Sequence, residues 1–340
     1  MNGSAVPPGR AAVITGIGSY LPPDVVTNDD LALRLDTSDA WIRTRTGIGR
    51  RHVVSPGTAT SDLAVEAGAR ALESAGWDRV DAVVLATTTP DQPTPATAPQ
   101  VASRLGLGTV AAFDVSAVCT GFLYGLATAS GLIASGAAEQ VLLVTADAFT
   151  TIIDPEDRGT AVIFGDGAGA VALRAGDADE PGAVGPLVLG SDGSLSHLIE
   201  VPGGGSRQRS SGKPVDPGDQ FFKMLGRETY RHAVEHMTDA SRTAVGRAGL
   251  EISDIDRLVA HQANARILEA VADRLEIPAG ARLSNIEQVG NTGGASIPLL
   301  LAQATADGRL AAGHRVLLTA FGGGLSWGAA TLVWPELRSV

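Results

Sequence analysis

The hydrophobic positions of this chain follow two different spacings in alternation. Short runs of valine, leucine and isoleucine, typical of buried strands, alternate with alanine-rich segments whose apolar residues recur at helical spacing. Segment 111–136 shows both patterns: Ala111–Val115 predicts a strand, and apolar residues from Phe122 to Ile133 predict a helix that Gly136 ends. The alternation along the chain predicts an α/β fold.

The same pattern occurs twice along the chain. In each copy a helix leads into a strand, a second strand follows a turn, and a glycine-rich turn leads into a third strand. The matching segments are 71–87 with 244–262, 137–147 with 312–322, and 165–173 with 324–333. The first two pairs share an offset of about 175 residues. We therefore predict two homologous halves, 11–180 and 181–340, joined by the linker-like segment Ala175–Pro186.

Composition argues against several classes of protein and of site. The 340 residues carry a net charge of −11, which argues against nucleic acid as the main partner. No apolar run reaches the length of a membrane span, and the first ten residues, MNGSAVPPGR, lack the layout of a signal peptide. A single cysteine excludes an intrachain disulfide and a cysteine-rich metal site. We expect a cytoplasmic protein without a membrane partner.

That cysteine, Cys119, stands where the predicted strand turns into the predicted helix. A thiol at the start of a helix lies near unpaired backbone N–H groups and the positive end of the helix dipole, which favour the thiolate. We therefore expect Cys119 to be a nucleophile with increased thiolate character. The alternative is an inert core cysteine, because free cysteines are commonly buried.

Two further polar residues lie at predicted turns in the second half. His261 directly follows the apolar run Leu258–Ala260, and catalytic groups are common at the C-terminal ends of strands in α/β sheets. Asn291 lies in the glycine-rich turn VGNTGGASIP. The structural alternatives are a hydrogen-bonded core histidine and a scaffolding asparagine. Together with Cys119, these residues form a Cys/His/Asn set that suits acyl transfer.

Six ordered segments resemble the β-ketoacyl-[acyl-carrier-protein] synthase III family, condensing enzymes of the thiolase superfamily. The resemblance runs from Ala11 to the C-terminus. Its segments are TSDAWIRTRTGIGRRH, the cysteine segment, DRGTAVIFGDGAGAVAL, HQANARI, GNTGGASIP and AFGGGLSWG. The resemblance implies a thiolase-like fold with five layers, αβαβα, built from two duplicated halves, which agrees with the repeat.

The resemblance also implies an activity: decarboxylative condensation of an acyl-CoA primer with malonyl-[acyl-carrier-protein], which initiates fatty acid or polyketide chains. Cys119 would attack the acyl-CoA and carry the acyl group, and the backbone N–H groups of Cys119 and Gly323 would form the oxyanion hole. His261 and Asn291 would stabilise the enolate that forms when the malonyl thioester loses CO2. No metal and no redox cofactor is implied, since coenzyme A enters as the thioester of the substrate.

Residues that bind coenzyme A follow from the same resemblance. Trp41 and Arg158 would hold the adenine between them, because an aromatic ring and a guanidinium both stack on a flat base. The other residues implied are Arg45 and Thr46 near the adenine, and Gly226 and Asn264 along the pantetheine arm. A half-buried anchor is the structural alternative for Trp41.

Carrier protein is acidic, so this acidic chain needs a local basic surface to bind it. Lys223, Arg227 and Arg231 recur every four residues in segment 221–237, which we predict to be a helix with these side chains on one face. The resemblance favours Arg231, together with Arg266 and Arg274 on the helix after the histidine, as the docking patch. A solvated helix face is the alternative.

Two positions depart from the usual family pattern. Val118 precedes the nucleophile, where the family often has a smaller residue, and its side chain would tighten the acyl pocket. Thr94 stands where some members place a phenylalanine at the floor of the acyl pocket, contributed across a homodimer interface. We therefore expect a homodimer whose pocket prefers primers of about four or more carbons.

Three other activities are open to a chain with these residues. An acyltransferase on the same fold would pass the acyl group to a hydroxyl or amine without condensation, but such transfer does not need both His261 and Asn291. A cysteine hydrolase would release the acyl group from Cys119 to water. A catalytically silent subunit would only bind carrier protein.

Overall fold

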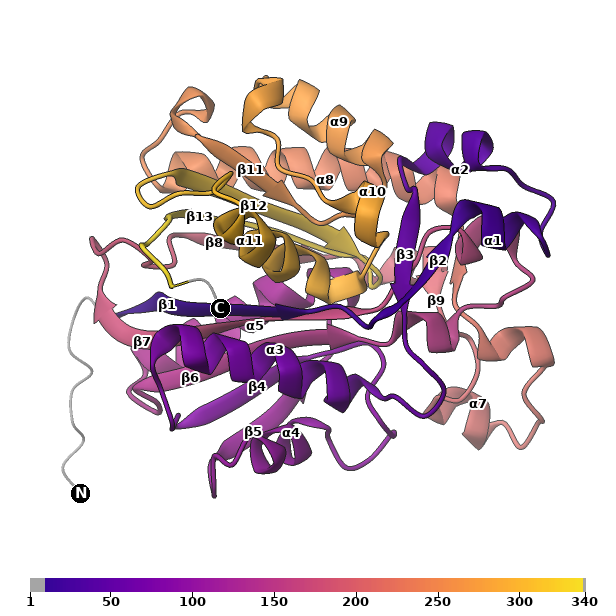
Figure 1. The fold of residues 1–340 in the computed structure, drawn as a ribbon, viewed down its shortest axis with the longest axis horizontal. Coiled ribbons are helices and arrows are strands. Elements are labelled where there is room, and N and C mark those ends of the chain that lie inside the picture. The colour runs from indigo at the N-terminus through magenta and orange to yellow at the C-terminus, as the bar shows by residue number, and fades with distance from the viewer. Residues whose placement is uncertain (1–9, 339–340) are drawn as a thin grey trace.

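The computed structural model describes residues 10–338, which form two main sheets with helices around and between them (Figure 1). The first sheet has the strand order β1, β7, β6, β4, β5. Strands β6, β4 and β5 pair in parallel, and β7 pairs antiparallel with both β1 and β6. The bounds are β1 Arg10–Tyr20, β4 Ala82–Ala86, β5 Ala111–Val115, β6 Gln140–Asp147 and β7 Gly167–Asp177.

The second sheet repeats this arrangement in the order β11, β12, β13, β8. Strands β11 and β12 are parallel, and β13 pairs antiparallel with both β12 and β8. A single parallel bridge between Leu258 and Arg282 takes the place that β5 has in the first sheet. The bounds are β8 Leu187–Ser191, β11 Arg257–Ala260, β12 Arg315–Gly322 and β13 Ser326–Val333. The repeated segments of the sequence therefore supply equivalent strands of the two sheets.

Six of the helices form three layers that alternate with the sheets (Figure 1). Helices α5 and α11 lie between the two sheets, α3 and α4 cover the outer face of the first sheet, and α8 and α9 cover the outer face of the second. The bounds are α3 Thr60–Ala75, α4 Ala98–Arg104, α5 Gly121–Ala134, α8 Gly226–Arg247, α9 Ala265–Arg274 and α11 Ser296–Ala306. The predicted five-layered αβαβα fold is confirmed.

The central helices are apolar on all sides because each is covered by both sheets. Phe122 and Leu126 of α5 and Leu300 of α11 are 1% exposed or less. Small residues let the central helices approach the sheets closely: a Cβ added to Gly125 would lie 2.5 Å from the side chain of Leu143 in β6. Helix α8, with only one face buried, carries polar residues on its other face.

Helix α8 begins later than the sequence predicts. It starts at Gly226, whereas Lys223 belongs to β10 (Lys223–Met224), which pairs with β9 (Ile199–Glu200). Lys223 forms an ion pair with Asp219. The predicted face of three basic residues is therefore wrong: Arg227 and Arg231 share the helix, but Lys223 lies on a strand because its backbone pairs with β9.

Smaller elements, α10 among them, cover the ends of the sheets at the right of Figure 1. Their bounds are α1 Asn28–Ala32, α2 Asp39–Thr46, β2 Asp24–Thr27, β3 Arg50–Val53, α6 Arg158–Ala161, α7 Ser206–Ser210 and α10 Ile286–Val289. The chain passes from the first sheet to the second between the end of β7 and the start of β8, within the predicted linker. The halves 11–180 and 181–340 stay a prediction.

The first nine residues of the predicted N-terminal tail and the last two residues of the predicted second half lie outside the described residues. Within residues 10–338, no helix is both long enough and apolar enough to cross a membrane.

Candidate active site

The nucleophile candidate lies in a tight turn between β5 and α5. Residues Val118–Thr120 form a 3-10 turn, and α5 follows at Gly121. Val118 has a φ of 45°, an uncommon and strained value for a β-branched residue. Gly294 lies directly against this turn, since a Cβ there would come within 3.0 Å of the Val118 carbonyl oxygen. Cys119 is thereby held, 8% exposed, at a fixed place.

The environment of the Cys119 thiol favours its neutral form. Burial raises the pKa of the Cys119 thiol to about 12, and the nearby carboxylate of Asp147 adds to the increase. The expected increase in thiolate character is therefore wrong, since burial shifts the pKa of the thiol in the opposite direction. The physical reason is that the thiol is almost completely desolvated, which outweighs the roughly 0.3–1 kcal/mol that a helix dipole typically supplies.

His261 follows β11 and is 1% exposed. Its Nδ1 is 2.7 Å from the Ser296 hydroxyl oxygen, which also accepts the Gln262 backbone N–H at 3.2 Å. We assign the hydroxyl proton to the bond with Nδ1, which leaves the ring proton on Nε2. Burial lowers the pKa of His261 to about 3, so the imidazole is neutral.

Asn291 is held by its own backbone and side chain. Its N–H donates to the Ile163 carbonyl and its carbonyl accepts from the Gly165 N–H, both at 2.9 Å. Its side-chain oxygen accepts the Gly293 N–H at 3.0 Å, so the amide nitrogen is the group left to act as a donor. That nitrogen makes only a long contact of 3.5 Å, to the Ala263 carbonyl.

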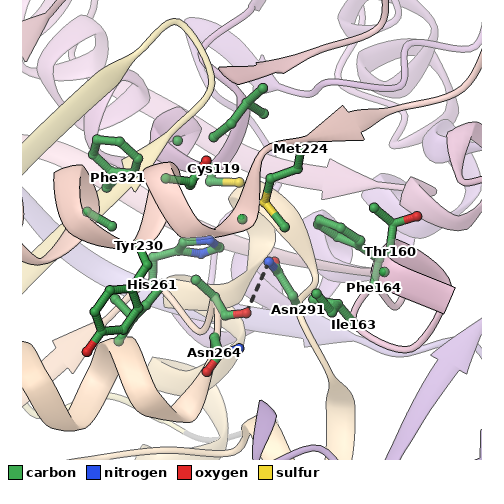
Figure 2. Close-up of a pocket in the computed structure, with 18 of the residues that line it drawn as sticks. Cys119, Thr160, Ile163, Phe164, Met224, Tyr230, His261, Asn264, Asn291 and Phe321 are labelled. Atoms are coloured by element: carbon green, nitrogen blue, oxygen red, sulfur yellow. Dashed lines mark hydrogen bonds between the residues drawn. The ribbon is translucent and has the colours of Figure 1, made fainter. Parts of the chain in front are cut away.

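Cys119, His261 and Asn291 line one cavity of about 570 Å³ (Figure 2). The structure thus brings together three residues that are far apart in the sequence, from position 119 to position 291. The remaining wall near the thiol is largely apolar, and its side chains are Ile163, Phe164, Ile199, Phe222, Met224, Met237 and Phe321. The burial of His261 and Asn291 strengthens the electrostatic effect of the hydrogen bonds that they can donate into this cavity.

Four residues predicted to bind substrates also line this cavity: Arg45, Gly226, Asn264 and Arg266. Asn264 caps α9 by accepting the Arg266 N–H at 2.9 Å, and its side chain donates to the Arg45 carbonyl at 3.1 Å. The start of α9 and the end of α2 are thereby joined at the cavity.

Trp41 lies outside the cavity wall, between two guanidinium groups. The Cζ atoms of Arg45 and Arg158 are 4.3 Å and 4.9 Å from its ring centroid. Arg158 also donates to the Asp36 carbonyl. The structure does not bring Thr46 to this surface: its side chain is buried and donates to the Ile42 carbonyl at 2.7 Å.

The glycine turn 322–324 packs against the nucleophile. A Cβ on Gly322 would lie 2.8 Å from the Cys119 Cβ and 2.9 Å from its nitrogen, so only glycine fits there. Gly322, rather than Gly323, lines the cavity. Gly323 follows it and faces the side chains of Ile199 and Val118. The role of the Gly323 N–H as an oxyanion donor stays a prediction.

The remaining predicted positions lie at the surface or away from the cavity. Arg231 on α8, and Arg266 and Arg274 on α9, are exposed, and within residues 10–338 none of them forms an ion pair. Thr94 is exposed in the loop between β4 and α4 and does not line the cavity of its own chain. Val118 is partly buried but is also not part of the cavity wall.

Three phenylalanines beyond the thiol were not predicted from the sequence. The rings of Phe149 and Phe164 stack with their centroids 4.4 Å apart, and Phe222 packs edge-on against both at 5.2 Å and 5.1 Å. Phe164 and Phe222 line the cavity. Because the three residues are far apart in the sequence, no local signal could have marked this wall.

Asp147 is a second residue that sequence reasoning missed. It is 0% exposed, and its carboxylate accepts N–H groups from Thr88 at 2.6 Å and Gly294 at 2.8 Å. Burial raises the pKa of Asp147 to about 7, although these hydrogen bonds oppose the shift. A polar residue directly after the buried run of β6 was the available signal. Its bond to Gly294 fixes the turn that follows Asn291.

Comparisons with known proteins agree with this site. Two family models match the chain, 3-Oxoacyl-[acyl-carrier-protein (ACP)] synthase III over residues 113–193 and its C-terminal counterpart over residues 245–334. Beta-ketoacyl-[acyl-carrier-protein] synthase III 3 of Streptomyces coelicolor is 58% identical over 97% of this chain and 99% of its own. The corresponding enzyme of Pseudomonas aeruginosa is 52% identical over 96% of this chain and 98% of its own.

Solved structures show the same likeness. The crystal structure of 3-oxoacyl-(acyl carrier protein) synthase III from Pseudomonas aeruginosa matches with a TM-score of 0.90 and 50% identity, over 96% of this chain and 99% of that one. A priming β-ketosynthase of a polyketide biosynthetic pathway matches with a TM-score of 0.90 and 35% identity, over 98% and 99% of the two chains. The chain belongs to the β-ketoacyl-[acyl-carrier-protein] synthase III family.

Proposed function

We propose that this chain condenses an acyl-CoA primer with malonyl-[acyl-carrier-protein] in two half-reactions that share one cavity, with acyl-Cys119 as the intermediate between them. Membership of the family makes the chain a condensing enzyme that initiates fatty acid or polyketide chains. The observation that carries the proposal is the placement of Cys119, His261 and Asn291 around a single cavity. A nucleophile and two neutral donors match the needs of the two half-reactions.

The first half-reaction transfers the acyl group to Cys119. The sulfur attacks the thioester carbonyl, the bond to the coenzyme A sulfur breaks, and the thiol proton ends on the departing coenzyme A. Burial raises the pKa of Cys119 to about 12, so we place the loss of its proton together with formation of the new bond. The N–H groups of Cys119 and Gly323 would stabilise the oxyanion, and removal of one such donor typically costs about 2.7–4 kcal/mol.

The second half-reaction forms the carbon–carbon bond. The malonyl thioester loses CO2, and the electron pair moves into an enolate whose oxygen accepts hydrogen bonds from His261 Nε2 and the Asn291 amide nitrogen. The enolate carbon then attacks acyl-Cys119, the carbon–sulfur bond breaks, and the Cys119 sulfur takes a proton from solvent. Burial keeps His261 neutral, so that it donates without first competing for a proton. No step calls for a metal or a redox cofactor.

Coenzyme A would enter along the surface formed by α2 and α9. Arg45, Gly226 and Asn264 would contact its pantetheine arm and phosphates, and Trp41 with Arg158 would hold the adenine. Both arginine side chains contact the ring of Trp41, so the adenine would share this surface with a guanidinium. Thr46 would contribute through its backbone only, because its side chain is turned inward.

Malonyl-carrier protein would dock on the exposed arginines of α8 and α9, namely Arg231, Arg266 and Arg274. These residues supply a local positive charge on a chain with a net charge of −11. Arg266 lies at the cavity itself, so a carrier bound there could deliver its malonyl arm to Cys119.

We also propose a cytoplasmic homodimer. Within residues 10–338, β5 pairs on one side only, with β4, and it is the edge of the first sheet. A second copy that extends the sheet at β5 would cover its exposed backbone groups. The loop that carries Thr94 lies between β4 and α4 and would reach the partner's acyl pocket.

Intact mass spectrometry tests the proposed function directly. The protein is incubated with a panel of acyl-CoA thioesters and then with malonyl-carrier protein, and both partners are weighed. We expect an acyl adduct on the protein that disappears as β-ketoacyl-carrier protein appears. Loss of the adduct to water would indicate a hydrolase, and transfer to a hydroxyl or amine without loss of CO2 would indicate an acyltransferase.

A further inference from the structure

Two buried hydroxyl groups connect the nucleophile turn to the glycine turn that packs against it. Thr120 follows Cys119 and is 0% exposed, and Ser326 is the first residue of β13 and 6% exposed. Their hydroxyl oxygens are 2.8 Å apart, although the residues are 206 positions apart in sequence. This contact, which we call the Thr120–Ser326 bridge, joins the two halves of the chain one residue from the nucleophile.

Each hydroxyl also reaches the backbone of a residue next to the site. Thr120 Oγ1 is 2.6 Å from the Ala117 carbonyl oxygen, and Ser326 Oγ is 2.9 Å from the Gly323 carbonyl oxygen. Two protons thus serve three close contacts. If both protons were donated to the carbonyls, two hydroxyl oxygens would face each other at 2.8 Å without a proton between them. Any arrangement leaves one of the three contacts without a proton of its own. When Thr120 donates to the Ala117 carbonyl, at the shortest of the three distances, the Ser326 proton is shared between the Gly323 carbonyl and Thr120 Oγ1.

The bridge lies beside a backbone turn that is also held by the pairing of Gly322 with Ser326 between β12 and β13. Residues 322–324 are three glycines, which lack side chains and gain the most conformational freedom when they are released. Gly322 is held on one side by its contact with Cys119, and the Gly323 carbonyl is held on the other by Ser326. The peptide that carries the Gly323 N–H lies between these two restraints.

We propose that Thr120 and Ser326 are positioning residues that hold the Cys119 and Gly323 N–H groups in register, so that both donate to one thioester oxygen. This inference rests on the oxyanion hole of the proposed function. The decarboxylation donors are fixed separately, His261 by Ser296 and Asn291 by Gly293. Loss of the bridge therefore affects the acylation of Cys119 and spares the decarboxylation of the malonyl thioester.

The experiment compares Ser326→Ala and Thr120→Val with two matched variants. Thr120→Ser keeps the hydroxyl, and Thr128→Val removes a hydroxyl of the following helix, α5, that donates to the Tyr124 carbonyl. We expect the first two variants to slow single-turnover acylation by acyl-CoA about 10–30-fold, less than the 10²–10³-fold loss of a whole donor. The KM for acyl-CoA and the rate of malonyl decarboxylation should change by less than about twofold.

The matched variants and the double variant sharpen this expectation. Thr120→Ser and Thr128→Val should acylate within about threefold of the wild-type rate, and the double variant should be no slower than the slower single variant. Unchanged acylation in both Ser326→Ala and Thr120→Val would overturn the proposal. An equal loss of both half-reactions would also overturn it, because that result indicates a general structural role.

A measurement that does not depend on activity separates this proposal from the proposed function. Hydrogen exchange of the backbone amides in residues 319–326 should be faster in Ser326→Ala and Thr120→Val, and unchanged in Thr128→Val. If the wild-type protein formed no acyl-enzyme, the proposed function would fail, yet this exchange would still decide whether the bridge fixes the glycine turn. Identical exchange in all variants would overturn the bridge.

Discussion

Helices α5 and α11 are equivalent central helices, yet the turns before them carry different chemistry. Each helix follows a 3-10 turn, Val118–Thr120 before α5 and Gly293–Ala295 before α11. The first turn presents a thiol, and the second follows Asn291, which presents an amide donor. The two turns lie against each other where Gly294 approaches the Val118 carbonyl. The two equivalent turns therefore place a nucleophile and a hydrogen-bond donor at one cavity.

Burial has the same outcome for the thiol at the first turn and for His261, which follows β11. Burial raises the pKa of Cys119 to about 12 and lowers the pKa of His261 to about 3, so both groups are neutral. A neutral imidazole is ready to donate a hydrogen bond. A neutral thiol must lose its proton during its attack on the thioester. Acylation therefore depends strongly on stabilisation of the oxyanion, whereas decarboxylation needs no proton transfer.

The largest effect should come from removing the nucleophile. Cys119→Ser should abolish acyl-enzyme formation and lower condensation by more than about 1000-fold, because a serine hydroxyl is a much weaker nucleophile than a thiol. Intact mass after incubation with acyl-CoA measures the adduct. A variant that condenses at nearly the wild-type rate would show that both half-reactions proceed without the Cys119 thiol.

The second turn and its histidine should be separable from the first. His261→Ala and Asn291→Ala should each lower malonyl decarboxylation by about 10²–10³-fold, the usual loss for one oxyanion donor, while Cys119 is still acylated. Release of CO2 and adduct mass, measured in parallel, check this. Slow acylation combined with normal decarboxylation would reverse the assignment of the two turns.

Charge at the cavity mouth should affect only the half-reaction that uses carrier protein. Arg266→Glu should raise the KM for malonyl-carrier protein by about tenfold at low salt, with less effect at high salt, because encounter of charged surfaces is screened. Acylation by acyl-CoA should be nearly unchanged. Arg207→Glu, on α7 and apart from α9 in Figure 1, is the matched control. An unchanged KM at low salt would exclude α9 from docking.

Primer choice should depend on the first half-reaction alone. Thr94→Phe should shift kcat/KM from primers of four or more carbons toward acetyl-CoA by about tenfold, since each buried CH₂ contributes about 0.8 kcal/mol. Competition between acetyl-CoA and butyryl-CoA measures the shift. A wild-type preference for acetyl-CoA that Thr94→Phe leaves unchanged would place the pocket floor elsewhere, with the phenylalanine cluster around Phe164 as the first candidate.

The smallest effect is on stability as a function of pH. The pKa of His261 is lowered from 6.5 to about 3, so the unfolded chain binds the extra proton and stability rises with pH across this window. The pKa of Asp147 is raised from 3.8 to about 7, so stability falls with rising pH across that window. The quantity to compare is the melting temperature of His261→Gln minus that of wild type at the same pH. This difference should be about 2 °C or more higher at pH 4 than at pH 7.

Asp147→Asn should show the opposite sign: its melting temperature minus that of wild type should be higher at pH 7 than at pH 4. Thermal melts of the three proteins in matched buffers measure both differences. Parallel pH profiles for all three would mean that neither buried group changes its proton affinity on folding.

The spacing of apolar residues predicted the strands and helices, and the family resemblance implied their arrangement in five layers. Strands and central helices are recorded in the spacing of apolar residues, because each central helix must be apolar on every side that a sheet covers. The repeat gave the two equivalent sheets. Cys119, His261 and Asn291 were predictable because each stands at the end of an apolar run or in a glycine-rich turn, and the family resemblance joined them.

Properties that depend on residues packed together from distant parts of the chain could not be predicted from local sequence. Lys223 left the predicted helix because its backbone pairs with β9, and Thr46 turned inward to the Ile42 carbonyl. The neutral state of Cys119 and the Thr120–Ser326 bridge follow from contacts with the second half of the chain. Local sequence sets backbone preference and helix dipole, whereas desolvation and hydrogen-bond partners are set by neighbours in space.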